Sequence, residues 1–134
     1  MYEIKNLTND QVDDIENRLD EYDNNFLPKP LDGFIRIGAF DNGKLIGGLD
    51  ACMTSFRILY VSTVFVDENY RRKGVAKSLM EQLEQRAKEL GADIIRLDTF
   101  DWQGRDFYKS IGYKEVGSYE TKDFSEHFYL KILE

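Results

Sequence analysis

The sequence predicts an α+β (mixed α/β) fold, in which a central, mostly antiparallel sheet of about six to seven strands is flanked by helices. Two kinds of pattern lead to this prediction. Residues 10–23 and 74–90 carry apolar side chains at helical spacing, whereas short apolar runs bounded by turn residues are typical of strands. A strand at 58–66, a helix and a strand at 94–100 follow one another, which predicts one parallel crossover.

The amino-terminal part is expected to hold a short strand at 2–6 and then a helix. Thr8 or Asn9 can cap this helix, and Pro28 and Pro30 follow it as helix breakers. Four apolar residues share one face of the helix, and its other face is acidic. The four apolar residues are Val12, Ile15, Leu19 and Tyr22.

The rest of the chain alternates between strand and helix patterns. The turn Asp41-Asn42-Gly43-Lys44 between two apolar runs is a strong hairpin signal. Gly91 and Gly112 follow predicted helices and are expected to end them. The predicted strands are 34–40, 45–53, 58–66, 94–100, 113–119 and 127–133, and the predicted helices are 74–90 and 103–111.

Composition limits the class of protein. The chain has 134 residues, the usual size of one domain, so we expect a single domain over 1–134. It has 18 Lys and Arg against 25 Asp and Glu, a formal charge of −7, which disfavours binding to nucleic acid. No apolar run approaches the length of a membrane span, and no secretion signal is visible. We therefore expect binding neither to membranes nor to nucleic acid. The single cysteine, Cys52, cannot form a disulfide within the chain, which suits the cytoplasm, so we expect a cytoplasmic protein.

A cationic turn before the second long helix carries the clearest chemical signal. Arg71, Arg72 and Lys73 precede Gly74, and Lys77 follows in the first helical turn. Unpaired N–H groups at a helix start, beside a glycine and positive charge, suit a pyrophosphate. A basic turn with only a structural role is the competing interpretation. A Walker A loop and a dinucleotide fingerprint are both excluded because the required glycines are missing.

Two motifs resemble those of the GNAT superfamily of N-acetyltransferases. Arg71-x-x-Gly74-x-Ala76 after an apolar strand is similar to that family's acetyl-CoA-binding signature. The segment 101–113, with its Phe107-Tyr108 pair, resembles a second family motif. The resemblance implies a GNAT-like, partly splayed sheet. It also implies acetyl transfer from acetyl-CoA to a primary amine of a small molecule or peptide. With one His and one Cys in the sequence, we expect no metal site.

The resemblance also assigns roles to residues. Backbone N–H groups of the loop are expected to hold the pyrophosphate, and the end of strand 58–66 to pair with the pantetheine arm. Tyr108 matches a tyrosine that protonates the departing thiolate. Asp101 stands where the family commonly has Asn, so Gln103 is expected to supply the missing amide. The expected cofactor-binding residues are Val64, Phe65, Val66, Arg71, Arg72, Lys73, Gly74, Val75, Ala76 and Gln103.

The sequence does not assign the general base that removes the proton of the amine. Many relatives use a carboxylate on the strand matching 58–66, and this strand has none. Water, Asp98 and Asp101 are the alternatives. The missing carboxylate favours a second interpretation, a catalytically silent module that binds or responds to acyl-CoA.

The acceptor side offers weaker signals. The acidic face of helix 10–23 could attract a cationic amine, although such a face also serves solubility. Phe100, Trp102 and Tyr22 could line the acceptor pocket or simply pack in the core. Cys52 is expected to be an ordinary buried thiol, and pairing it with His127 as nucleophile and base lacks a third orienting group. A homodimer stays open.

Overall fold

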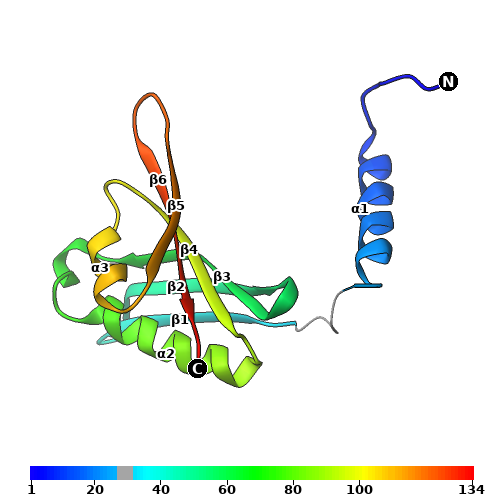
Figure 1. Cartoon of the computed structure of the whole chain (residues 1–134). Helices are drawn as coiled ribbons and strands as arrows, with labels where there is room; N and C mark the ends of the chain where they lie inside the picture. The colour runs from blue at the N-terminus through cyan, green and yellow to red at the C-terminus, as the bar shows by residue number, and fades with distance from the viewer. Residues whose placement is uncertain (27–31) are drawn as a thin grey trace. The chain divides into compact units, whose positions relative to one another are not determined.

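The computed structural model describes residues 1–26 and 32–134, which form two compact units, Met1–Pro30 and Leu31–Glu134. Pro28 and Pro30 lie outside the described residues, and the single-domain organisation stays a prediction. The first unit holds α1 (Asn9–Asp23) and the second holds the sheet and two further helices (Figure 1). The strands are β1 (Phe34–Asp41), β2 (Lys44–Thr54), β3 (Ile58–Val66), β4 (Ile94–Phe100), β5 (Lys114–Glu120) and β6 (Ser125–Ile132), and the helices are α2 (Val75–Leu90) and α3 (Arg105–Ser110).

The first unit contains the predicted helix but not the predicted strand. Thr8 caps α1: its side chain accepts from the Gln11 N–H, while the Gln11 side chain accepts from the Thr8 N–H. Residues 2–6 form no strand, so that prediction is wrong. A strand requires backbone partners, and among the described strand pairs none includes these residues. The apolar stripe of α1 is present but exposed, and the helix buries none of its residues.

The second unit is built on a six-stranded sheet in the order β1-β2-β3-β4-β6-β5. The β1–β2 hairpin turns at Asn42 and Gly43, whose φ angles of 50° and 83° are those of the predicted tight turn. All neighbouring strands are antiparallel except β3 and β4, which run parallel as predicted. The mostly antiparallel sheet of the α+β prediction is therefore confirmed, with six strands.

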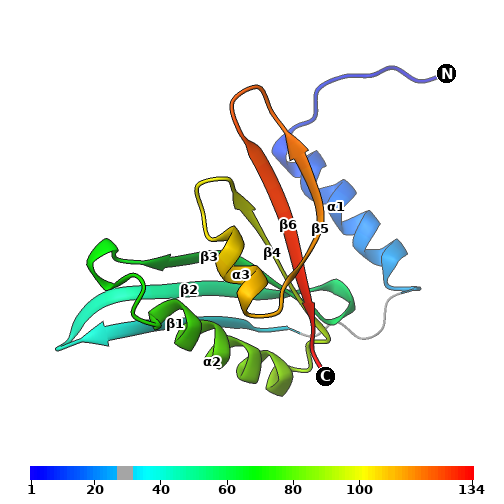
Figure 2. The same cartoon turned by 60° about the vertical axis from the view of Figure 1, so that its left-hand side comes forward.

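The two helices of the second unit pack against its sheet. Helix α2 packs against β1, β2 and β3, and α3 contacts β5 (Figures 1 and 2). The core forms between α2 and the sheet, where Leu59, Met80, Leu83 and Ile95 are almost fully buried. Helix α3 is shorter than the predicted 103–111, because residues 101–104 form a turn instead. Among the described helices, none is long and apolar enough to cross a membrane.

Candidate active site

The sheet opens between β3 and β4. Their parallel pairing covers only Ile58–Val61 opposite Ile94–Leu97, so residues 62–66 of β3 lack a partner on the β4 side. A bulge at Ser62 starts this gap, since Asp50 of β2 pairs with Thr63 and Ala51 pairs with Val61. The extra residue changes which side chains are buried, from Leu59 and Val61 before it to Val66 after it. The free edge of β3 can therefore accept hydrogen bonds from, and donate them to, an extended ligand.

The turn from β3 to α2 is held in an unusual backbone path. Arg72 and Gly74 both adopt left-handed conformations, with φ angles of 63° and 82°. The Arg71 side chain donates from Nε to the Val66 carbonyl at 2.8 Å, and its guanidinium lies 5.5 Å from the Phe65 ring centre. This side chain therefore fixes the loop against the end of β3.

The start of α2 is open in a way that the start of α1 is not. Gly74 is the N-cap of α2 and has no side chain to accept from the first N–H groups, whereas Thr8 caps α1. A Cβ at Gly74 would meet no atom within 4 Å, so space lies next to this backbone. The amides of the first turn of α2 thus remain available to an anion, and the helix dipole favours negative charge there.

The open β3 edge and the α2 start line one cavity of about 890 Å³. Nine of the ten expected cofactor-binding residues line it, and Tyr108 lies on its wall. Its charged lining residues are Arg71, Arg72 and Lys77, and no described Asp or Glu lines it. In a chain with a net charge of −7, this cavity is a local cationic site suited to phosphates. The expected lining residues are Val64, Phe65, Val66, Arg71, Arg72, Gly74, Val75, Ala76 and Gln103.

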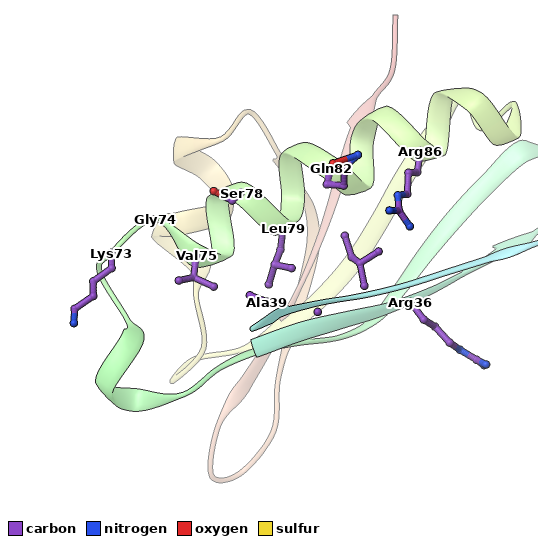
Figure 3. A pocket seen from close by; sticks show the side chains of 11 residues that line it. Arg36, Ala39, Lys73, Gly74, Val75, Ser78, Leu79, Gln82 and Arg86 are labelled. Atoms are coloured by element: carbon purple, nitrogen blue, oxygen red, sulfur yellow. The ribbon is translucent and has the colours of Figure 1, made fainter. Parts of the chain in front are cut away.

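Lys73, the tenth, is separated from this cavity. Its side chain lines a second cavity of about 700 Å³ between α2 and β1, together with Arg36 and Arg86 (Figure 3). Gly74 and Val75 line both cavities. The Lys73 ammonium also lies 5.6 Å from the Tyr70 ring centre. Its backbone stays in the loop, so the separation concerns the side chain only.

Three residues of the main cavity had no assigned site role in the sequence, namely Tyr70, Gly104 and Phe107. Tyr70 belongs to a short 3₁₀ turn (Glu68–Tyr70), and its hydroxyl donates to Asp41 at 2.6 Å. Its position directly before Arg71, at the start of the cationic turn, was the sequence feature that could have indicated a place in the cavity. Phe107 and Gly104 lie in the second motif, and the fold brings them into the cavity with the end of β3 and the start of α2.

Tyr108 lies in the second half of α3 and is 7% exposed. Its ring is edge-on to those of Phe107 and Tyr113, at 5.2 and 5.9 Å. Burial raises the pKa of Tyr108 to about 12, so the phenol stays protonated at neutral pH. A protonated hydroxyl on the wall of the cavity can donate a hydrogen bond to negative charge that develops there.

Gln103 closes the turn before α3. Its Oε1 accepts a hydrogen bond from the Phe100 N–H at 2.7 Å, and this bond does not use the side-chain NH₂ group. Because Gln103 also lines the cavity, its amide can donate to a ligand. This geometry fits the expected replacement of the family's Asn amide.

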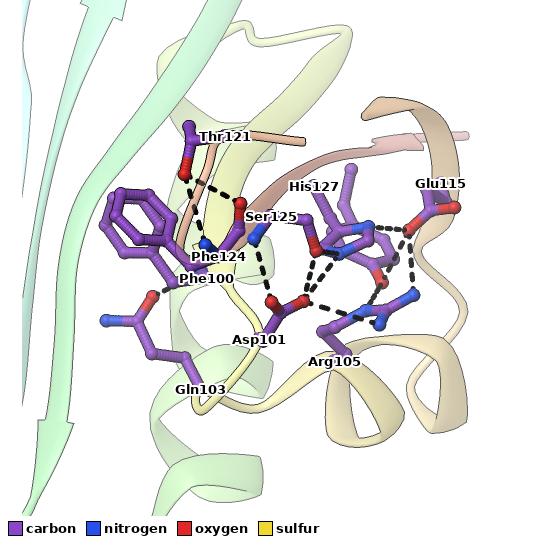
Figure 4. A network of polar contacts seen from close by, with 10 residues as sticks. Phe100, Asp101, Gln103, Arg105, Glu115, Thr121, Phe124, Ser125 and His127 are labelled. Atoms are coloured by element: carbon purple, nitrogen blue, oxygen red, sulfur yellow. Dashed lines mark hydrogen bonds and ion pairs between the residues drawn. The ribbon is translucent and has the colours of Figure 1, made fainter. Parts of the chain in front are cut away.

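Asp101 has a structural environment that accounts for a carboxylate at this position. It accepts from both the N–H and the hydroxyl of Ser125, and Nε2 of His127 lies 3.1 Å from its Oδ1 (Figure 4). Hydrogen bonds from the Ser125 side chain and backbone, and then from His127, lower the pKa of Asp101 to about 2. A carboxylate already occupied by these donors is poorly suited to removing a proton from an amine.

The same network continues through His127, which is 7% exposed. Its Nδ1 lies 2.7 Å from Glu115, whose carboxylate also accepts from Tyr129 at 3.2 Å. Arg105 reaches Glu115 at 3.4 Å (Figure 4). The network therefore ties the turn 101–104 and α3 to β5 and β6.

Cys52 does not join His127. It lies on β2, which β3 and β4 separate from β6, so the nucleophile-and-base pairing is excluded. The thiol is exposed, and the expectation that it is buried is wrong. Alternating residues of a strand face opposite sides, and Cys52 falls on the side away from its buried neighbour Ala51. No described group of three His, Cys, Asp or Glu side chains is arranged to hold a metal ion.

Asp98 lies on the sheet face opposite the core. It is half-buried, and the Tyr60 hydroxyl donates to its Oδ2 at 3.1 Å. Burial and the hydrogen bond to Asp98 raise the pKa of Tyr60. Between the two carboxylate candidates for a base, Asp98 has the fewer hydrogen bonds.

A splayed α+β sheet with a cationic, uncapped helix start beside its free edge defines an acyl-CoA acyltransferase type of fold. Comparison with known proteins identifies the family: the acetyltransferase (GNAT) family matches residues 1–113. The chain belongs to the GNAT acetyltransferase family, whose members are acyltransferase enzymes.

Individual relatives agree with this assignment. A crystal structure of an acetyltransferase from Bacillus cereus ATCC 14579 is 33% identical, covers 98% of each chain and has a TM-score of 0.89. Blasticidin-S acetyltransferase of Streptomyces morookaense is 30% identical over 91 residues, 67% of this chain and 66% of that protein. An aminoglycoside 6′-N-acetyltransferase complexed with coenzyme A shares the fold, with 19% identity, a TM-score of 0.69 and coverage of 75% and 73%.

Proposed function

We propose that this protein is an N-acetyltransferase that transfers the acetyl group of acetyl-CoA directly to a primary amine of a small molecule or peptide. The observation that carries the proposal is the single cavity where the uncapped start of α2, the free edge of β3 and Tyr108 meet. The blasticidin-S and aminoglycoside enzymes among its relatives support a small-molecule amine.

The cavity fits acetyl-CoA in three places. The loop from Arg71 to Ala76 offers N–H groups to the pyrophosphate, and Arg72 and Lys77 add positive charge. On the side of β3 away from β2, the backbone from Val64 to Val66 can pair with the amides of the pantetheine arm, as an added strand would. The Val66 carbonyl already accepts from Arg71, so the free groups are mainly those of Val64 and Phe65. The Gln103 amide provides a further donor.

Acetyl-CoA supplies a thioester carbonyl, at which a C–N bond to the amine forms and the C–S bond breaks. Tyr108 donates its hydroxyl proton or a hydrogen bond to the departing sulfur, and its raised pKa keeps that proton available. The amine must lose a proton to become neutral before its attack. Water or Asp98 receives that proton in this scheme, because Asp101 is occupied by Ser125 and His127.

A catalytically silent acyl-CoA-binding module is the second candidate. The observation in its favour is that β3, from Ile58 to Val66, carries no carboxylate. Such a module would use the same cavity for CoA and would lack turnover.

Other properties follow from the same proposal. The charge of −7 supports a cationic substrate and disfavours nucleic acid and membrane partners. We place the protein in the cytoplasm, where a single cysteine stays reduced. A homodimer remains an open expectation.

Two measurements test the proposal. Titration calorimetry with acetyl-CoA is expected to show saturable binding, and a screen of amines is expected to release CoA thiol. The exposed Cys52 also reacts with thiol reagents, so a Cys52→Ser control removes its background. Binding without thiol release for any amine would favour the silent module, and absence of binding would exclude both candidates.

A further inference from the structure

An aromatic cluster of Phe100, Trp102 and Phe124 lies beside the cavity. The Phe100 and Trp102 rings are stacked, with centres 5.0 Å apart and planes 13° apart. Phe124 lies edge-on to both, at 5.1 and 5.7 Å. Trp102 is 68% exposed, so core packing does not explain it. It also lines the cavity that contains Tyr108.

The cluster is held in place by hydrogen bonds rather than by a core. Gln103 accepts from the Phe100 N–H, and the Thr121 hydroxyl accepts from the Phe124 N–H at 3.1 Å (Figure 4). Asp101 anchors the turn that carries Trp102 to Ser125. A rigid, exposed aromatic surface of this kind loses little conformational freedom when a flat ring stacks on it.

The charge changes sign at this cluster. On the cavity side, Arg71, Arg72 and Lys77 are cationic. On the open face of the sheet, Asp98 shares the Phe100 side of β4, and Glu126 of β6 pairs directly with Phe100. Tyr60 donates to Asp98 and Tyr119 donates to Glu126, which fixes both carboxylates. Arg96 is a cation on the same face of β4, and its guanidinium stacks on Tyr60 at 4.2 Å.

We infer that the acceptor is a cationic primary amine joined by a short linker to a flat aromatic or heteroaromatic ring. The ring stacks on Trp102, and the ammonium group lies toward Asp98 and Glu126. Asp98 and Phe100 are alternate residues of β4, about 7 Å apart, and Trp102 stacks on Phe100. A linker of about two carbons and half a ring spans a distance of this order. Trp102 thus determines which amines bind, and the ammonium group lies beside Asp98, the carboxylate candidate for its proton.

This inference rests on the proposed function, but its first test does not require turnover. Trp102 is the only tryptophan, so its fluorescence reports a ligand that stacks on it. We expect 2-phenylethylamine to change this fluorescence saturably. For 2-cyclohexylethylamine, which has the same charge and linker but no flat ring, we expect about tenfold weaker binding, the upper range for an aromatic pair. Equal binding of the two amines would overturn the inference.

Kinetics of the full chain give the second test. Trp102→Leu is expected to remove the preference for the aryl amine in kcat/KM, and Trp102→Phe to retain it, while the KM for acetyl-CoA stays the same. Asp98→Asn is expected to weaken both amines without changing their ratio. Phe40→Leu, an exposed aromatic outside both cavities, is the matched control.

The outcomes separate the inference from the proposed function. Turnover without an aryl preference, or a preference that survives Trp102→Leu, overturns the inference and leaves the acetyltransferase proposal standing. A changed KM for acetyl-CoA in Trp102→Leu assigns Trp102 to the cofactor side and also overturns it. Selective amine binding without any turnover supports the aromatic site and overturns the acetyltransferase proposal instead.

Discussion

Replacement of Gly74 tests the proposed pyrophosphate site most directly. Gly74 caps α2 with a φ of 82°, and a Cβ there would meet nothing within 4 Å. A side chain at this position therefore fits sterically but is held in a left-handed conformation. Asp and Asn have nearly the same shape, and both tolerate this conformation better than most residues. Comparing Gly74→Asp with Gly74→Asn thus isolates the effect of one negative charge on CoA binding.

The expected size of that effect follows from the exposure of the site. At a separation of about 5 Å, two like charges repel by about 0.8 kcal/mol in water and by about 3 kcal/mol at an effective dielectric of about 20. These energies correspond to about fourfold and about 150-fold in affinity. Because the cavity is open to solvent on the side of the loop, we expect CoA to bind Gly74→Asp about tenfold more weakly than Gly74→Asn.

Titration calorimetry with CoA, at low and high salt, measures this difference. The gap between the two variants is expected to narrow at high salt, because ions screen exposed charges. Urea unfolding of both variants checks that they lose similar stability from the strained backbone. Equal affinity of the Asp and Asn variants would show that the pyrophosphate does not lie at the start of α2.

Two further predictions concern Tyr108 and Asp101. Tyr108→Phe is expected to lower turnover by about 10- to 100-fold, toward the lower end of general acid catalysis, while CoA affinity changes little. Calorimetry and thiol release measure the two effects, and equal losses would make Tyr108 a packing residue. Asp101→Asn is expected to destabilise the fold at pH 7, because the carboxylate accepts from Ser125 and His127. The pKa of folded Asp101 is lowered to about 2, so its stabilisation is present above about pH 4 and is lost as the pH falls toward 2. Urea unfolding across this pH range should show that the free energy of unfolding of Asp101→Asn approaches that of wild type as the pH falls. A difference in unfolding free energy that does not depend on pH would contradict this account.

Local sequence signals were sufficient for most elements. The β1–β2 turn, the boundaries of β3 and β4 and the glycine at each end of α2 all follow from short-range backbone preferences. The strand expected at 2–6 was wrong because its pattern has no partner in the described sheet. A strand forms only when another strand supplies its hydrogen bonds, and local sequence does not show this.

Side-chain environments were less predictable than elements. Periodicity places Cys52 on β2 but did not show which side of the strand was buried. The contacts of Asp101 were equally hidden, because Ser125 and His127 lie about 25 residues further along the chain. Both depend on which strands become neighbours.

The sequence by itself determined the α+β class, the parallel crossover and the cationic glycine turn at a helix start, because each follows from local residue patterns and the order of the elements along the chain. Only the tertiary structure decided that the Ser62 bulge frees the edge of β3, and that Lys73 points its side chain away from the main cavity. It also placed the aromatic cluster between a cationic cavity and two carboxylates. These features depend on strand register and on contacts between distant segments, which the packing of the whole sheet sets.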